Sequence, residues 1–433
     1  MRITNLRGEI LDSIPRKGSE VLLEKEVVKV VERIIEDVRK NGDKAVIEYL
    51  REFDEFEGDQ IKVSEDEFLR AREEVETSVE LTGVVKGFLE MIERVKSFHQ
   101  EQLRHFHLYG KWVAKTKGIV GQVIKPIERV CVYVPGGRAI YPSTLIMNLI
   151  PAKVAGVKEI FVSTPSKKGK IPSVILYLCE IMGINDVFKV GGAVAVASFA
   201  FGTETIPKAD MIVGPGNKYY VTAKKILNGI IGIDMLPGPS EIAVIANTGN
   251  PHFISLDLLS QLEHDPDSSG YFISTNQELI ERVKEEVLST LDKAKRKDIL
   301  SKSVDNFFFI LVESIEEGFE IVNAIAPEHL EVIVEGISIE NIDNYVKNAG
   351  TVIIGNNTPV VLTDYIAGVN HVLPTGATAR FSSPLGVYNF VKLYNIAQWD
   401  NKSLEEDIPT ISKLARYEQL EIHALSAERR SNS

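Results

Sequence analysis

The first 110 residues place apolar side chains at helical spacing on an otherwise charged chain. From Val27 to Val38 these side chains recur every three or four residues, which predicts an amphipathic helix. Asn41-Gly42 is expected to end this helix, and a second amphipathic stretch follows from Asp43. Helix-forming residues continue from Glu65 to about His107. This part of the chain is therefore predicted to be largely helical.

From residue 119 onward, short β-branched runs are each followed by a turn and an amphipathic stretch. Four such units begin with the segments 131–137, 160–165, 187–192 and 210–217. EIAVIA, YFIST, NFFFILV and GTVIIG indicate a second α/β region, and the tail from about 386 is expected to be helical with little β structure. Strands that alternate with helices predict mostly parallel, doubly wound sheets.

Composition narrows the class of protein without indicating its chemistry. The 433 residues are 44% hydrophobic and 25% charged, as in a soluble multidomain protein. A net charge of −12 argues against nucleic acid and anionic lipid as partners. The chain shows neither a signal peptide nor the roughly 20 apolar residues that span a bilayer. Cys131 and Cys179 are expected to be reduced in the cytoplasm, with Cys131 in the core.

The glycine turns are the first candidates for a binding site. They read PGGRA, VGGAVA and VGPGN, and none spells G-x-G-x-x-G. A glycine turn between a strand and a helix can present main-chain N–H groups to a phosphate. It can equally be a tight turn that needs a positive φ. Dinucleotide binding by a degenerate Rossmann-like domain is one interpretation of these turns, and purely structural turns are the other.

The histidines offer candidates for metal binding and proton transfer. His99, His105 and His107 lie among polar residues and are expected at the surface or an interface, and His252 is expected at a helix entry. Gln261 and His264, three residues apart near a helix end, could bind one metal ion or form a solvated face.

Two further segments carry residues of the same chemistry. Glu328 and His329 follow Pro327 and could supply two proton-transfer groups. Glutamine, histidine and aspartate side chains are ligands suited to zinc, and the two cysteines fit no metal-binding pattern. A zinc hydrolase fits these residues as well as a dehydrogenase does. A nucleotide-binding regulatory protein that keeps the glycine turns without any chemistry is the non-enzymatic alternative.

Seven segments, from residue 133 to 423, resemble histidinol dehydrogenases in order and separation. They are YVPGGRAIYPS, VGPGNKYYVTAKK, GPSEIAVIA, DLLSQLEHDPDS, APEHL, TDYIAGVNHVLPT and EQLEIHA. The blocks around Gln261, Glu328 and Asp364 are specific as a combination. The resemblance implies the oxidation of L-histidinol through its aldehyde to L-histidine, with two NAD reduced at one zinc site per subunit. A related zinc/NAD alcohol dehydrogenase with another polar substrate is the alternative within this chemistry.

The resemblance also implies a fold and an assembly. It predicts two incomplete Rossmann-like domains with mostly parallel sheets, small helical N- and C-terminal domains, and an intertwined homodimer. The divisions expected are a helical segment at 1–27, a first Rossmann-like domain at 28–132 plus 242–385, a second at 133–241 that contacts NAD, and a tail at 386–433 that reaches the partner subunit.

Site residues follow from the same matched motifs. The implied zinc ligands are Gln261, His264, Asp364 and His423, with Glu328 and His329 as the acid–base pair. Ser240, His371 and Glu418 are expected to hold substrate together with the zinc ligands and His329, and Tyr133 and Asn217 to contact NAD. Glu418 and His423 would complete the site of the other protomer. Val194 departs from many members of the family, in which a glutamine at this position contacts NAD.

Overall fold

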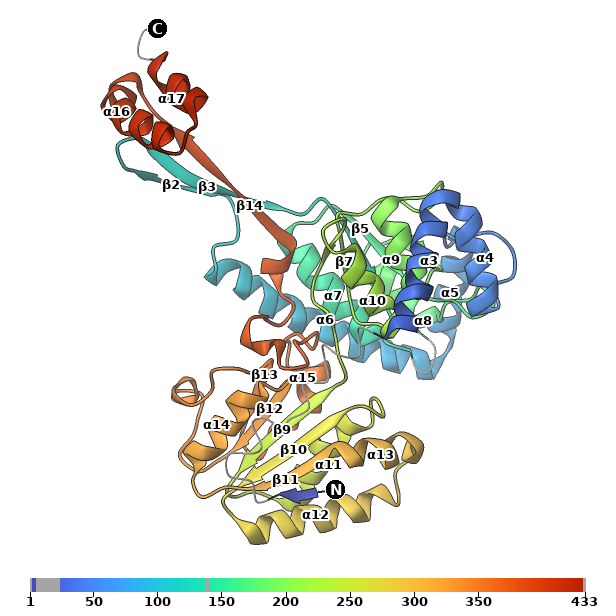
Figure 1. Ribbon diagram of the computed structural model, residues 1–433. Coiled ribbons are helices and arrows are strands. Elements are labelled where there is room, and N and C mark those ends of the chain that lie inside the picture. The colour runs from blue at the N-terminus through green and yellow to red at the C-terminus, as the bar shows by residue number, and fades with distance from the viewer. Residues whose placement is uncertain (1, 5–23, 137–139, 431–433) are drawn as a thin grey trace.

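The computed structural model of the protein describes residues 2–4, 24–136 and 140–430 (Figure 1). Two parallel sheets form the body, and a three-stranded antiparallel sheet projects from it with two helices at its far end (Figure 1). Most of the expected helical segment at 1–27 lies outside the described residues. No helix within the described ranges is long and apolar enough to cross a membrane.

The first parallel sheet has the strand order β6-β5-β4-β7-β8. Its strands are β4 (Arg129–Tyr133), β5 (Glu159–Ser163), β6 (Val187–Phe188), β7 (Met211–Val213) and β8 (Gly232–Ile233). The connecting helices are α7 (Pro142–Ala155), α8 (Ser173–Ile181), α9 (Gly192–Phe201) and α10 (Lys218–Leu227). This confirms the four predicted strand–helix units, although the PGGRA turn lies partly outside the described residues.

Four N-terminal helices cover this first sheet. They are α3 (Lys25–Asn41), α4 (Asp43–Asp54), α5 (Glu65–Thr77) and α6 (Val79–His105). Gly42 has a φ of 52°, a conformation that favours glycine, and separates α3 from α4 as the sequence predicts. Helix α3 packs on α9 and α10, α5 on α8, and α6 on α7. The structure thus groups these helices with the 129–233 sheet, whereas the sequence-based division places residues 28–132 with 242–385. The reason is that their apolar stripes are buried in the core clusters of the first sheet.

The second parallel sheet has the order β1-β11-β10-β9-β12-β13. Its strands are β1 (Arg2–Thr4), β9 (Glu241–Ala246), β10 (Ser269–Ser274), β11 (Phe307–Leu311), β12 (His329–Ile333) and β13 (Thr351–Ile354). Its helices are α11 (Pro251–Leu262), α12 (Gln277–Leu291), α13 (Lys297–Ser303), α14 (Ile315–Ile325) and α15 (Val361–Tyr365). In the first sheet, β4 comes first along the chain and lies between β5 and β7. In the second sheet, β9 lies in the same way between β10 and β12. This strand order is that of half of a Rossmann fold.

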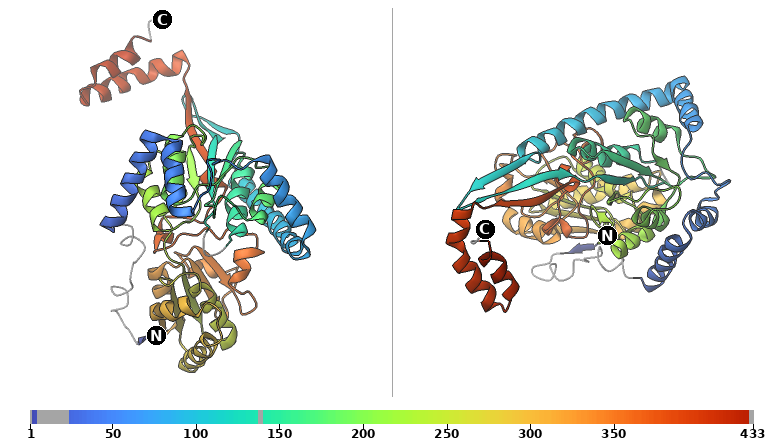
Figure 2. Two further views of the ribbon diagram at one scale, coloured as in Figure 1. Left: turned by 90° about the vertical axis from the view of Figure 1, so that its right-hand side faces the viewer. Right: turned by 90° about the horizontal axis from the view of Figure 1, so that it is seen from above.

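The projecting arm consists of β2 (Lys111–Lys115), β3 (Ile119–Pro126) and β14 (Val391–Gln398), followed by α16 (Asn401–Tyr417) and α17 (Glu421–Glu428). The two helices confirm the predicted helical tail. The expectation of little β structure after 386 is wrong, because β14 pairs with β3 along its whole length. Its side chains are mostly exposed on both faces, so no core-facing alternation marks it in the sequence. Figure 2 shows the arm carrying α16 and α17 away from the second sheet in two further views.

Candidate active site

The candidate acid–base residues lie at the amino ends of β9 and β12. Glu328 precedes β12, His329 is its first residue, and His329 is paired in register with Ile242 of β9. The main-chain N–H of Glu241 donates to Glu328 Oε2 at 3.0 Å. A Cβ on Gly350 would lie 2.5 Å from the Glu328 carbonyl oxygen, so the neighbouring strand needs glycine there. Ligands of open α/β sheets usually bind at the carboxyl ends of strands, and this site lies at the opposite edge.

His329 lies between two carboxyl groups. Its Nδ1 is 3.8 Å from Glu328 Oε2 and its Nε2 is 3.9 Å from Asp364 Oδ1. The side chain is buried, and neither ring nitrogen has a hydrogen-bond partner among the described residues. Burial lowers the pKa of His329 to about 3, with smaller contributions from His264 and His371. The ring is therefore neutral at physiological pH and keeps a free nitrogen for a ligand or a proton.

Two of the predicted metal ligands are also brought to this place. Gln261 lies in the last turn of α11, and its Nε2 donates to Asp364 Oδ2 of α15 at 3.3 Å. His264 follows the end of α11 and is exposed in the protomer. Its charge acts on both His329 and His371, so it lies near them. Gln261, His264 and Asp364 therefore surround one side of His329.

The carboxyl groups of the site are unusually basic. Burial raises the pKa of Glu328 well above its ordinary value, and the charges of Glu241 and Asp364 raise it further. Burial also raises the pKa of Asp364 to about 6. Groups with perturbed pKa values that converge on one place are typical of functional sites.

The loop after α15 positions His371. Its Nδ1 hydrogen-bonds the carbonyl oxygen of Asp364 at 3.0 Å, and burial lowers its pKa to about 4. Asn370, the preceding residue, donates to Met147 O at 2.7 Å and lies 3.4 Å from His99 Nε2. The prediction that His99 lies at the surface or an interface is wrong, because it is fully buried in α6 and supports this loop. Several apolar neighbours along α6 put His99 on its buried face.

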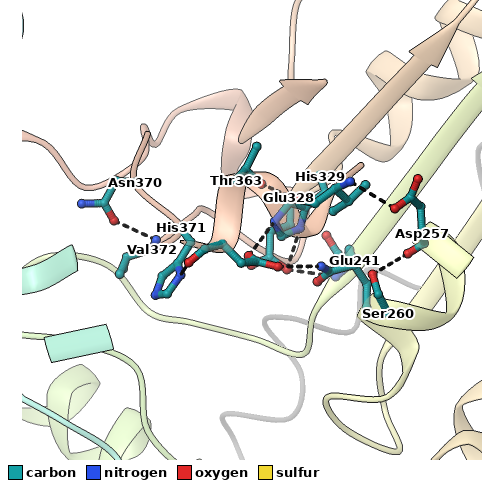
Figure 3. A network of polar contacts seen from close by, with 12 residues as sticks. Glu241, Asp257, Ser260, Glu328, His329, Thr363, Asn370, His371 and Val372 are labelled. Atoms are coloured by element: carbon teal, nitrogen blue, oxygen red, sulfur yellow. Dashed lines mark hydrogen bonds and ion pairs between the residues drawn. The ribbon is translucent and has the colours of Figure 1, made fainter. Parts of the chain in front are cut away.

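Figure 3 shows this part of the site, with Glu328 and His329 beside Glu241, and His371 and Asn370 on the loop that approaches them. Ser240 directly precedes β9 on the same edge, and its carbonyl oxygen accepts from Ser269 N at 3.0 Å. The residues assigned to acid–base work, and Ser240 and His371 assigned to substrate, thus share one edge of the second sheet.

Glu418 and His423 lie elsewhere in the protomer. Both are exposed, at the end of α16 and in α17, beyond the projecting arm (Figure 1). Among the described residues, no three His, Cys, Asp or Glu side chains come together in a way that could hold a metal ion. One protomer offers Gln261, His264 and Asp364 as oxygen and nitrogen donors, together with the unpartnered ring of His329. These donors fit zinc in type, and the predicted fourth ligand lies in the tail.

The predicted cofactor residues line a separate cavity at the carboxyl ends of β4 and β5. This cavity has a volume of about 1450 Å³, and Tyr133, Val194 and Asn217 contribute to its wall. Asn217 caps α10, with its side chain accepting from Tyr219 N and Tyr220 N at 3.1 Å each. These bonds occupy the N–H groups of Tyr219 and Tyr220, so Asn217 fixes the start of α10 at the wall of the cavity.

Glu241 is a site residue that the sequence reasoning missed. Its main-chain N–H binds Glu328, and its carboxylate accepts from Gly376 N at 3.2 Å. Burial raises the pKa of Glu241 to about 7. The signal in the sequence was an acidic residue directly before the apolar run IAVIA, at the edge where Ser240 was already a candidate.

A profile of the histidinol dehydrogenase family matches residues 19–431 of the chain. The histidinol dehydrogenase of Clostridium acetobutylicum is 43% identical over 415 residues, which cover 95% of this chain and 93% of that protein. That of Lactococcus lactis subsp. lactis is 42% identical over 423 residues, 96% of each chain. The crystal structure of histidinol dehydrogenase from Elizabethkingia anophelis matches with a TM-score of 0.89 and 34% identity, covering 98% of this chain and 96% of that one.

Proposed function

The chain belongs to the histidinol dehydrogenase family, and from that premise we propose that it oxidises L-histidinol to L-histidine with zinc and two NAD. The observation that carries the proposal is the His329 ring, buried with both nitrogens unpartnered between Glu328 and Asp364. The family membership favours this reaction over a zinc hydrolase or a regulatory nucleotide-binding protein, both of which the sequence left open.

The chemistry needs two hydride removals and one addition of water. The balance is one alcohol, one water and two NAD⁺ giving one carboxylate, two NADH and three protons. His329 accepts the hydroxyl proton of the alcohol in the first oxidation, because the buried ring is neutral and both of its nitrogens are unpartnered. Glu328 takes a proton from the water that adds to the aldehyde, since the raised pKa makes its ionised carboxylate a strong base.

The metal would be held by Gln261, His264 and Asp364, with His423 of the tail as the remaining ligand. Zinc supplies a template that orients the bound substrate when it is present. His371 and Ser240 lie on the same edge and would hold the polar end of the substrate. NAD would occupy the cavity beside Tyr133 and Asn217. Val194, a buried residue of α9 on the same wall, cannot supply the side-chain hydrogen bond that a glutamine would.

We also propose that two protomers exchange their tails. The arm and its helices expose large apolar side chains, which a monomer would leave in water. They include Trp112, Val113, Leu393, Tyr394, Tyr417 and Ile422. A partner covered by this arm would receive Glu418 and His423 at its own site.

Cys131 and Cys179 are free thiols in the structure, which agrees with a cytoplasmic location.

The test is to mix the purified protein with L-histidinol, NAD and zinc, and to follow NADH by absorbance and histidine by chromatography. Two NADH per histidine are expected. The absence of NADH from protein with its metal site loaded would contradict the proposal. Other polar alcohols assayed in parallel separate histidinol oxidation from the related alcohol dehydrogenase alternative.

A further inference from the structure

Asp257 and Glu331 form a buried carboxyl pair beneath the site. Asp257 lies in α11 and is 7% exposed, and Glu331 lies in β12 and is 1% exposed. The two carboxyl groups lie close enough that each changes the pKa of the other. Two buried carboxyl groups next to each other repel when both are ionised, so the pair is expected to hold one proton. Burial raises the pKa of Glu331, and the adjacent Asp257 raises it further. Burial raises the pKa of Asp257 as well.

The pair touches the three elements that carry the site. Side chains alternate along a strand, so His329 and Glu331 project from the same face of β12. The next residue on that face, Ile333, packs in the core cluster that contains Leu258 of α11. On α11, Asp257 lies one turn before Gln261, so both occupy one side of the helix.

A hydrogen bond of Asp257 extends the pair to α15. Asp257 Oδ1 accepts from the main-chain N–H of Val360 at 3.1 Å, and Val360 directly precedes α15, which carries Asp364. Figure 3 shows Asp257 and Ser260 in the same network as His329 and Glu328. One buried carboxyl group is therefore joined to β12 on one side and to the start of α15 on the other.

We propose that Asp257 and Glu331 are positioning residues of the active site, which hold Gln261, His329 and Asp364 in their convergent arrangement through a single shared proton and the Val360 bond. The inference rests on the proposed function, because it assigns these residues to the alignment of that same site. Neither residue reaches the reacting atoms. Glu331 is two residues into the sheet from His329, and Asp257 is one helical turn from Gln261.

A purely structural role does not account for two acidic groups at this place. A pair of apolar side chains would fill the same space without the cost of burying two carboxyl groups. What the carboxyl pair adds is direction. Its polar contacts fix how α11 is rotated about its own axis and where α15 lies relative to β12. Apolar packing restricts these positions less, because it is not directional. An error of about 1 Å at a reacting centre lowers catalysis by on the order of 100-fold.

The experiment compares four variants of the full-length protein. Asp257→Ala removes the link to both neighbours, and Glu331→Met removes only the link to β12 at similar volume. Glu331→Gln is the conservative variant, because its amide N–H can donate to Asp257 in place of the protonated carboxyl group. Val287→Ala is the matched control, a fully buried residue of α12 in the same core cluster as Leu258.

Each variant is measured for thermal unfolding, for kcat and KM with histidinol, and by crystallography of the metal-free protein. We expect Asp257→Ala and Glu331→Met to lower kcat by roughly 10- to 100-fold, with Glu331→Gln and Val287→Ala within about threefold of the wild type. In the crystal of Asp257→Ala, the 3.3 Å contact between Gln261 Nε2 and Asp364 Oδ2 should be lost. If Asp257→Ala does not fold, the kcat of Glu331→Met and its Gln261–Asp364 contact decide whether the pair positions the site.

The inference is overturned if Asp257→Ala or Glu331→Met unfolds earlier, as Val287→Ala does, but keeps wild-type kcat and the Gln261–Asp364 contact. It is also overturned if Glu331→Gln loses as much activity as Glu331→Met. A wild-type protein without activity on histidinol would instead contradict the proposed function. The metal-free structures of the variants would then decide the positioning role on their own.

Discussion

The main-chain N–H of Gly192 donates a hydrogen bond to the hydroxyl oxygen of Tyr133, 3.1 Å away. The Tyr133 ring stacks on Tyr220 of α10, with ring centroids 4.1 Å apart. One tyrosine at the end of β4 thus connects the glycine turn before α9 with the helix that Asn217 caps. These are the walls of the proposed NAD cavity, so Tyr133 supports the shape of the cavity as well as lining it.

Tyr133→Phe should weaken NAD binding by roughly fivefold, because the Gly192 N–H loses its acceptor, a loss of about 1 kcal/mol. The measurement is the KM for NAD at saturating histidinol, together with the midpoint of thermal unfolding. Tyr220→Phe is the matched control. The Tyr220 hydroxyl has no hydrogen-bond partner among the described residues, so its removal should leave the KM unchanged. If the two variants raise the KM for NAD equally, the hydrogen bond from Gly192 to Tyr133 does not contribute to NAD binding.

The sequence predicted most of the fold because its elements have regular patterns. The stripe from Val27 to Val38 and the Gly42 break marked α3 and α4, and the β-branched runs marked both parallel sheets. It did not predict β14, since Val391–Gln398 is mostly exposed and has no buried face to set a period. Antiparallel pairing of β14 with β3 joins residues more than 260 positions apart, which local patterns do not encode.

The candidate site was predictable in part for a different reason. The motifs around Gln261, Glu328 and Asp364 identified the residues, and the structure brings Gln261, His329 and Asp364 together. Their environment could not be read from the motifs. The support of the 370–371 loop by buried His99 depends on α6 packing beside that loop. The carboxyl pair of Asp257 and Glu331 depends on α11 packing on β9, the strand next to β12.

Asp54, at the end of α4, gives a dependence of stability on pH. Burial raises its pKa from 3.8 to about 6. The folded protein therefore binds a proton that the unfolded chain releases between about pH 4 and pH 6, and stability falls as pH rises through this window. Asp54→Asn cannot ionise and escapes this loss. It should gain about 1–2 kcal/mol over the wild type above pH 6, an amount reduced by the partial exposure of Asp54, and nothing near pH 4.

The measurement for Asp54 is urea unfolding of both proteins at several pH values from 4 to 8. Asp59→Asn is the control, because it makes the same chemical change at an exposed residue in the loop after α4. If the unfolding free energies of Asp54→Asn and the wild type differ by the same amount from pH 4 to pH 8, stability does not depend on the ionisation of Asp54.

His264→Asn should lose bound zinc while the fold persists. His264 is exposed beside the end of α11, so few packing contacts depend on it, and its loss removes a nitrogen donor from the proposed ligand set. Metal analysis after dialysis should fall from about one zinc per chain to less than about a tenth. His252→Asn is the control, since His252 is an exposed histidine on the same helix that pairs with Glu286. Full zinc occupancy in His264→Asn would remove this residue from the ligand set.

The exchange of tails between protomers can be tested by complementation. One chain is truncated before Arg416, so it keeps Glu328 and His329 but lacks Glu418 and His423. The other is full-length and carries Glu328→Ala and His329→Ala. Each homodimer lacks part of every site, because the first has no tail and the second has no acid–base pair. Both homodimers should therefore be inactive.

A heterodimer of the two chains contains one complete site. In a two-fold symmetric dimer each protomer lends its tail to the other, so the tail of the full-length chain reaches the intact Glu328 and His329 of the truncated one. Up to about half of the wild-type activity per dimer should return on mixing. The position of α16 and α17 at the end of the arm, away from the second sheet, is what makes this geometry feasible. If heterodimers form and their tail helices are folded, yet no activity returns, His423 does not act across the interface, and the zinc ligands must all come from one chain.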